Sequence, residues 1–99
     1  MDGEAKQALA TIRECVRRDR VRIKPHFTER MHERGLYWAD VVMVIDAPSG
    51  IRENGFDDDG RAKWIVAGAT HDGLKVEIVA SLDRDAQGKL TVFLTMFYV

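Results

Sequence analysis

The chain has 99 residues, 45% of them hydrophobic, and a formal net charge of −1, so it can form one domain (residues 1–99) around a core that needs no metal or disulfide. Its single cysteine, Cys15, excludes an internal disulfide, favours a reducing compartment, and is expected to be a buried apolar residue rather than a catalytic thiol. The longest apolar run, residues 41–45, is far shorter than the ~20 residues of a membrane span, so we expect a cytoplasmic protein that does not bind a membrane.

An amphipathic helix is predicted over residues 4–18. Its apolar side chains recur at helical spacing, at Ala5, Ala8, Leu9, Ile12 and Val16. Residues 20–24 then alternate basic and aliphatic side chains, which indicates a short extended segment. Pro25 ends this segment, because it donates no hydrogen bond and disfavours helical angles in the residue before it.

Two further helices are predicted before the pattern changes. The first begins at His26 or Phe27 and ends at Gly35, since a residue without Cβ adopts the left-handed conformation of a helix stop at least cost. The second covers about residues 37–47, and the Pro-Ser-Gly sequence at 48–50 ends it.

From Ile51 onward the apolar pattern has period two, which is typical of strands. Turns are predicted at 57–60 and 71–73 and a loop at 83–89, which separate strands at 51–56, 62–69, 74–82 and 90–99. We therefore expect an α+β fold, with two or three N-terminal helices packed on one face of a three- to four-stranded antiparallel sheet.

Strict alternation along the last strand predicts which side chains face the core. The expected core face carries Leu90, Val92, Leu94, Met96 and Tyr98. The other face carries Thr91, Phe93, Thr95 and Phe97, and is mixed enough to be a partner surface.

Basic residues are concentrated between Arg13 and Arg34, where eight Lys or Arg face four Asp or Glu, a local charge of +4. Such an asymmetry suits a phosphate-binding patch on a protein of near-neutral net charge. The alternative is a solvated helix end and turn.

Within this region His26, Arg30 and Arg34 lie four residues apart. On a helix they form a stripe about 12 Å long, beside the apolar pair Phe27 and Met31. Two guanidiniums match a phosphate, and an imidazole suits proton transfer near neutral pH, so the stripe indicates metal-free RNA cleavage. The alternative is a structural role, in which Arg30 pairs with Glu33 or either arginine pairs with an aspartate of the turn at 57–60.

Other candidate ligands of RNA are basic residues near the stripe or at the start of the second strand: Arg22, Lys24, Arg61 and Lys63. The sequence has no Gly-rich phosphate loop and no metal-binding motif. His26 and His32 are ~240° apart around a helix and cannot share an ion. We therefore expect no cofactor and no metal.

The run from His26 through Arg30-Met31 to Glu33-Arg34-Gly35-Leu36, followed by Asp40-Val41 and by Thr95-Met96-Phe97, resembles the bacterial domain-of-unknown-function family 4258. The resemblance covers about residues 22–98 and leaves 4–18 as an extension. It implies a relation to the small RelE/MqsR/BrnT-type toxins, a RelE-like fold and cleavage of RNA, with ribosome-bound mRNA as one option. It also implies a neutralising antitoxin that has a DNA-binding domain.

Two other functions fit the residues. One is a non-catalytic protein-interaction module that uses the surface of the first helix and the Phe93/Phe97 face. The other is RNA binding without cleavage, which would show a steep dependence on salt.

Overall fold

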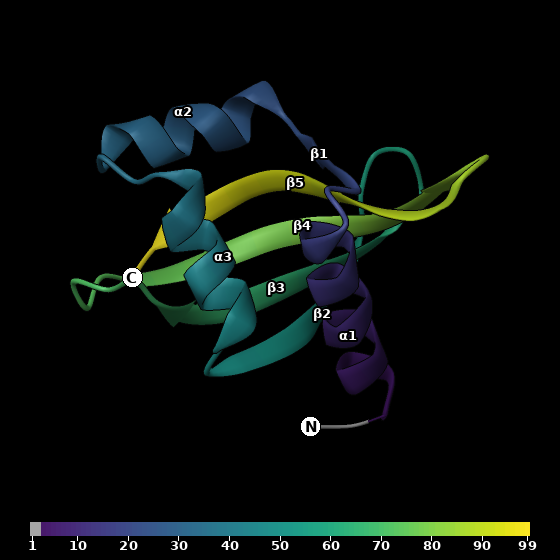
Figure 1. The fold of residues 1–99 in the computed structure, drawn as a ribbon, viewed down its shortest axis with the longest axis horizontal. Helices are drawn as coiled ribbons and strands as arrows, with labels where there is room; N and C mark the ends of the chain where they lie inside the picture. The colour runs from purple at the N-terminus through teal and green to yellow at the C-terminus, as the bar shows by residue number, and fades with distance from the viewer. Residues whose placement is uncertain (1–2) are drawn as a thin grey trace.

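The computed structural model describes residues 3–99, which form three helices and five strands (Figure 1). In chain order they are α1 (Gly3–Arg17), β1 (Val21–Ile23), α2 (Pro25–Glu33), α3 (Trp38–Asp46), β2 (Gly50–Phe56), β3 (Ala62–Ala69), β4 (Lys75–Asp85) and β5 (Gly88–Tyr98). The α+β class is confirmed, and the predicted helices lie within a residue or two of their expected bounds. Among the described helices, none combines the length and the apolar character that crossing a bilayer requires.

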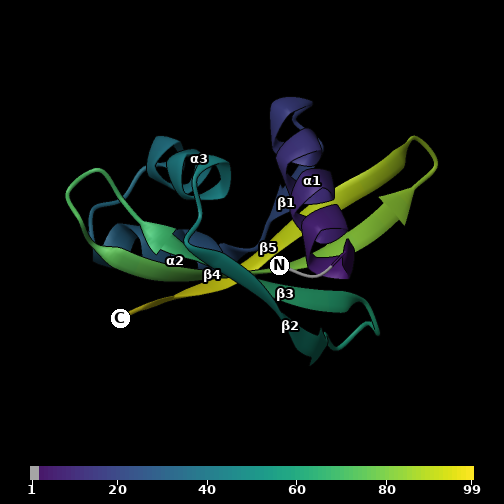
Figure 2. The same ribbon diagram turned by 90° about the horizontal axis from the view of Figure 1, so that it is seen from below.

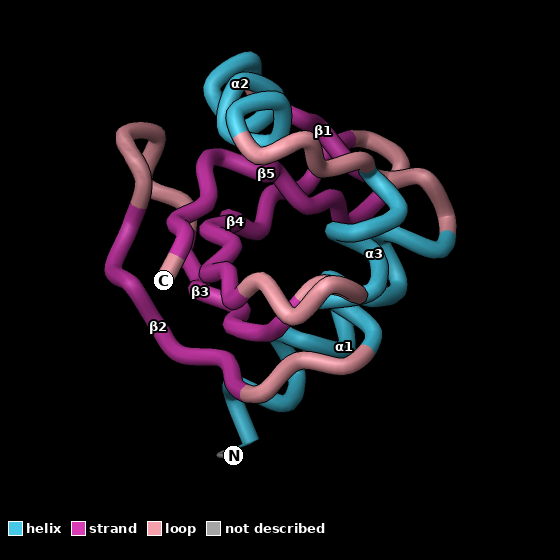
Figure 3. The backbone as a smooth tube through the Cα atoms, turned by 90° about the vertical axis from the view of Figure 1, so that its left-hand side faces the viewer, coloured by secondary structure: helices cyan, strands magenta, loops and turns pink. Residues whose placement is uncertain are grey.

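The strands form one mixed sheet in the order β1-β5-β4-β3-β2. Strands β2 to β5 are the antiparallel meander that the turns predicted. The short segment before Pro25 adds a fifth strand, which pairs parallel to β5. Figure 3 shows the helices on one side of this sheet, with α2 beside β5 and β1, while β2 curves round on the other side.

The core lies between the helices and one face of the sheet. Each helix contributes apolar residues from its predicted stripe, and β3, β4 and β5 contribute the facing side chains. The buried cluster includes Leu9, Ile12, Phe27, Met31, Val41, Val44, Ile45, Val66, Val76, Ile78, Ala80, Phe93 and Met96. Cys15 is buried as well, as expected for a small apolar side chain.

A bulge in β5 changes the predicted faces of that strand. Val79 of β4 pairs with Thr95, but the next residue, Ala80, pairs with Phe93, so Leu94 is an extra residue. An extra residue reverses the alternation on one side of a bulge. The predicted core face is therefore right for Met96 and Tyr98. The bulge reverses the faces of residues 90–94, although Leu90 and Val92 are still buried, as predicted.

Phe93 consequently faces the helices and is fully buried. Its ring packs edge-on against Phe27, at 5.4 Å between centroids, and against Trp38, at 5.2 Å. The expectation that Phe93 and Phe97 share an exposed partner surface is wrong, and only Phe97 is exposed. We call the face of the sheet opposite the helices, which carries Phe97, the open face.

The helix ends show how local sequence fixes the packing. Gly35 has a φ of 65°, and the N–H of Leu36 bonds to the carbonyl of Met31 at 2.9 Å. This is the predicted glycine stop of α2. The guanidinium of Arg13 donates to the last carbonyls of α3, those of Ile45 and Asp46, at 3.0 and 2.9 Å, and so ties α1 to α3.

The β4–β5 hairpin is longer than predicted, because residues 83–85 and 88–89 continue the two strands and only residues 86–87 form the turn. Figures 1 and 2 show this hairpin projecting from the body of the protein. The side chains near the tip of this hairpin are almost all polar, so the sequence there lacks the alternation of apolar and polar residues that predicts a strand. Arg20 stabilises the tip by donating to Asp85, to the side chain of Gln87 and to the carbonyls of Gly88 and Lys89.

Candidate functional site

Helix α2 lies along the part of β5 that β1 leaves unpaired. Strand β1 pairs only with residues 91–93, so the carbonyl of Met96 has no neighbouring strand on that side. The Nε of Arg30 donates to this carbonyl at 2.9 Å. Burial of Phe27 and Met31 holds the helix in the orientation that allows this bond.

Tyr98 brings the two predicted arginines together. The guanidinium carbon of Arg30 lies 5.2 Å from the centre of the Tyr98 ring, and that of Arg34 lies 4.6 Å from it. Both distances suit a cation–π interaction. The Tyr98 hydroxyl donates to the main-chain carbonyl of Arg30, and burial of the ring raises the pKa of that hydroxyl. Two cations are thus fixed on one aromatic ring.

The two arginines differ in what else they bind. Arg30 is partly buried and also donates to Glu33 at 2.6 Å, the local ion pair that the sequence suggested. Arg34 is exposed, and its guanidinium has no carboxylate partner among the residues that the structure describes. Arg34 is therefore free to bind an anion, whereas Arg30 would share its charge between Glu33 and a ligand.

His26 lies in the first turn of α2, one turn before Arg30. Its side chain is 63% exposed, and Nδ1 is 3.7 Å from a carboxylate oxygen of Glu29. Within the described chain its imidazole makes no bond to either guanidinium. The predicted stripe is therefore solvent-accessible and lies in a line, with its two arginines clustered on Tyr98.

Two of the other predicted basic residues lie together on the open face. Lys24 and Lys63 line a cavity of about 330 Å³ between Leu94 and Thr95 of β5 and the turn that carries Asp57, Asp58, Asp59 and Arg61. Neither ammonium group has a carboxylate partner among residues 3–99. The cavity borders Leu94 and Thr95, next to Met96, whose carbonyl accepts the hydrogen bond from Arg30.

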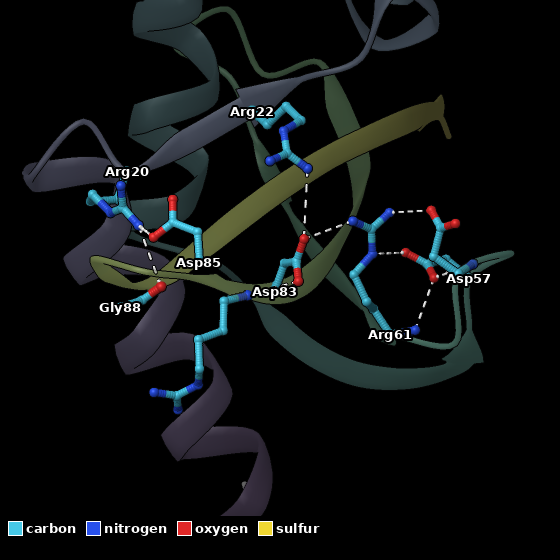
Figure 4. A network of polar contacts seen from close by, with 9 residues as sticks. Arg20, Arg22, Asp57, Arg61, Asp83, Asp85 and Gly88 are labelled. Atoms are coloured by element: carbon cyan, nitrogen blue, oxygen red, sulfur yellow. Dashed lines mark hydrogen bonds and ion pairs between the residues drawn. The ribbon is translucent and has the colours of Figure 1, made fainter.

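Arg61 and Arg22 have a different environment (Figure 4). The three nitrogens of the Arg61 guanidinium bond to Asp57, Asp59 and Asp83, at 2.7, 2.8 and 2.9 Å. Arg22 lies 3.6 Å from Asp83. The Arg61 side chain is only 15% exposed, so its charge is already neutralised. The three aspartates that precede Arg61 in the sequence were the available signal for this arrangement.

A family model described as "Domain of unknown function (DUF4258)" matches residues 23–96, about three quarters of the chain. The chain belongs to the DUF4258 family. The match agrees with the resemblance in the sequence, and the family description assigns no function. No curated protein matches the chain.

The DUF4258 segment contains His26, Arg30, Arg34, both open-face lysines, and Arg61 with its three aspartates, whereas Arg22 lies just before it. It ends before Tyr98, the residue that holds the two arginines together, and it begins after α1. In residues 3–99 no group of three or more His, Cys, Asp or Glu side chains is placed to hold a metal ion.

The carboxyl group of Asp57 in this DUF4258 chain has a strongly lowered pKa. Burial alone would raise its pKa, but hydrogen bonds from the Arg61 main chain and guanidinium outweigh burial and lower the pKa to about 2. The carboxylate also accepts the N–H of Asp59 at 2.9 Å. Asp57 therefore closes the β2–β3 turn and holds Arg61 in place.

We expect Asp57 to make the free energy of unfolding depend on pH in the acidic range. Because its pKa is lower in the folded chain than the ordinary 3.8, its contribution is complete above about pH 4 and is lost as the pH falls towards 2. The difference in pKa corresponds to about 2 kcal/mol. Urea unfolding should show Asp57→Asn less stable than wild type by about this amount at pH 7 and by less than half of it near pH 2.5. The exposed neighbour gives the control, Asp58→Asn, for which an equal loss would contradict this assignment.

Proposed function

We propose that this protein is a metal-independent endoribonuclease, related in activity to the RelE-type toxins. The observation that carries the proposal is the pair of guanidiniums held on the Tyr98 ring, of which Arg34 has no carboxylate partner in the described chain. Two cations at i and i+4 repel each other on a helix, and Glu33 pairs with only one of them, so an anionic ligand would explain the presence of both.

The scissile phosphate would bind between Arg30 and Arg34. A guanidinium donates two parallel hydrogen bonds to phosphate oxygens, and its charge stabilises the negative charge that develops on phosphorus. Stacking on Tyr98 restricts both side chains, which lowers the entropy that they lose when RNA binds. Arg30 would exchange part of its bond with Glu33 for the phosphate.

His26 would transfer the proton. Side chains four residues apart on a helix have Cβ atoms about 5–6 Å apart, so the imidazole can reach a phosphodiester bound at Arg30. His26 removes the proton of the ribose 2′-hydroxyl, the 2′-oxygen forms a bond to phosphorus, and the bond from phosphorus to the 5′-oxygen breaks. The 5′-oxygen takes a proton from the imidazolium or from water. The products are a 2′,3′-cyclic phosphate and a 5′-hydroxyl end.

The rest of the RNA strand would cross the β5 edge towards the open face. Lys24 and Lys63 lie there without carboxylate partners in the described residues and would bind neighbouring phosphates. Arg61 and Arg22 are left out of this RNA path, because their charges are neutralised by aspartates. The proposal includes ribosome-bound mRNA as a substrate and a neutralising antitoxin with a DNA-binding domain as a partner.

The test is cleavage of a labelled single-stranded RNA in the presence of EDTA. We expect His26→Ala to cut at least about a hundredfold more slowly than wild type, because a general base commonly contributes that much. The matched control is His32→Ala, which removes an exposed histidine from the same helix and should leave the rate unchanged. Equal rates for His26→Ala and wild type would remove His26 from the mechanism.

Replacing Arg34 separates a binding role from a structural one. Its side chain is exposed, lies over the Tyr98 ring and has no ion pair in the described chain, so Arg34→Ala should cost less than about 1 kcal/mol of stability. Its affinity for RNA should fall at least tenfold. Arg17→Ala removes an exposed arginine from another helix and serves as the control. A sharp fall in melting temperature with unchanged affinity would make Arg34 a structural residue.

RNA binding without cleavage is the second candidate. It is favoured by the bonds of Arg30 to Met96 and Glu33 and by the lack of a contact between His26 and either arginine in the described chain. In that case RNA would bind with a steep salt dependence, the Arg34→Ala effect would persist, and no product would form. Failure of both binding and cleavage would leave a protein-interaction module.

A further inference from the structure

Helix α1 and the β4–β5 hairpin enclose a long groove. It consists of two cavities, of about 430 and 570 Å³, both of which are lined by Gln7, Thr11 and Lys89. We call this feature the α1 groove. It extends along α1 from Glu4 to Arg18, and α1 lies outside the DUF4258 segment. The α1 groove is therefore built on an element that the family model does not include.

The first cavity contains a buried donor without an acceptor. Trp64 lines this cavity and is 4% exposed, and its indole N–H has no hydrogen-bond partner in the described structure. A buried tryptophan usually finds an acceptor for this group. The nitrogen itself is covered by other atoms, so a carbonyl or carboxylate oxygen of a ligand would reach it once side chains of the cavity wall move aside.

Unpaired cations line the same groove. Glu14 is neutralised by Arg17 and Arg18, each at 2.5 Å. The carboxylate of Asp83 is bound by Arg61 and Arg22, as described above. In contrast, the side chains of Lys89 and Arg84 have no carboxylate partner within residues 3–99, and Glu4 is the one unpaired carboxylate of the described lining. The groove therefore favours an acidic ligand.

The length of the α1 groove fits a short extended peptide. Arg18 directly follows the end of α1 and is fourteen positions from Glu4, which at the helical rise corresponds to about 21 Å. An extended chain advances about 3.3–3.6 Å per residue, so about six residues span this distance. Small and apolar side chains between the polar ones, those of Ala8 and Leu82 in the first cavity, can accept alternate side chains of such a peptide.

We propose that the α1 groove binds an extended acidic segment of a partner protein. A carboxylate of the segment would pair with Lys89 and Arg84, and a peptide carbonyl would accept the hydrogen bond of the Trp64 indole. The groove and the α2 site use different residues, so the two proposals can fail separately.

The experiment measures binding of fluorescein-labelled hexapeptides by anisotropy. The peptides carry glutamate at every second position, with alanine, serine or leucine between, and the controls carry glutamine or lysine in place of glutamate. We expect saturable binding of at least one acidic peptide and at least tenfold weaker binding of its glutamine and lysine versions. Lys89→Gln should weaken binding at least fivefold. Trp64→Phe, which keeps an aromatic side chain but loses the N–H and part of the ring volume, should also weaken it.

Two variants show whether the effect belongs to the groove. Lys6→Gln makes the same charge change on α1, but Lys6 lines a different cavity, with Leu9 and Pro48, so this variant should bind the peptide normally. His26→Ala should also bind normally, whatever its effect on RNA. Melting curves confirm that each variant is folded.

Three results would overturn the proposal. They are no saturable binding of any acidic peptide, equal binding of the glutamine version, and equal weakening by Lys6→Gln and Lys89→Gln. Displacement of the peptide by single-stranded RNA from wild type, but not from Lys89→Gln, would assign the groove to nucleic acid instead.

Discussion

Replacing Phe93 by alanine is expected to lower the free energy of unfolding by about 3–5 kcal/mol, the usual cost of removing a buried phenylalanine side chain. Phe93 has no exposed surface, and its ring contacts both Phe27 and Trp38 edge-on. The substitution would leave a cavity where α2, the start of α3 and the sheet meet. Chemical denaturation at neutral pH, followed by circular dichroism, measures the loss.

The matched control is Phe97→Ala, on the same strand. Phe97 is 49% exposed on the open face, so its replacement should cost less than about 1 kcal/mol. The comparison tests the bulge at Leu94 directly, because strict alternation without a bulge would place Phe93 and Phe97 on one face. Similar losses for the two variants would contradict the observed register.

Replacing Arg61 by alanine should have an effect of similar size, a loss of about 3–5 kcal/mol. The substitution leaves the nearly buried Asp57 and the partly buried Asp83 without their main counter-charge. It would also release the β2–β3 turn from the open face. The effect should shrink as the pH falls towards 2, because Asp57 is then protonated and no longer an unpaired charge.

An exposed ion pair on the same face provides the comparison. Arg52 bonds to Glu77 at 3.0 Å, with the arginine side chain 55% exposed, and such pairs contribute at most about 1 kcal/mol. Arg52→Ala should therefore be nearly neutral in the same denaturation experiment. If Arg61→Ala were equally mild, the network in Figure 4 would be a solvated surface cluster rather than a structural support.

The sequence predicts most of the secondary structure because the two halves of the chain have distinct periods. The helical stripe that contains Leu9 and Ile12, and the alternation of Val76, Ile78 and Ala80, each bury the residues they predict. Along residues 90–94, however, four of five side chains are large and apolar, so a one-residue shift leaves the pattern unchanged. A bulge at Leu94 therefore has no signature in the sequence.

In the candidate site, too, the contacts between residues close in sequence were predictable and those between distant residues were not. Spacing along α2 places Arg30 and Arg34 on one stripe and identifies Glu33 as a local partner. Their common contact with Tyr98 joins residues more than sixty positions apart, and a single sequence contains no measure of that distance. Two of the carboxylates around Arg61, those of Asp57 and Asp59, precede it in the same turn and are visible in the sequence. The third, that of Asp83, comes from β4, so the complete neutralisation of Arg61 is clear only from the fold.

The hydrogen bond from Arg30 to the Met96 carbonyl also bears on self-association. A free sheet edge can recruit a strand from another molecule, and a side chain that occupies its carbonyl blocks this docking. A polyanion that drew the Arg30 guanidinium outward would uncover the edge again. Ligand occupancy and the tendency of this protein to polymerise through its sheet would then be coupled.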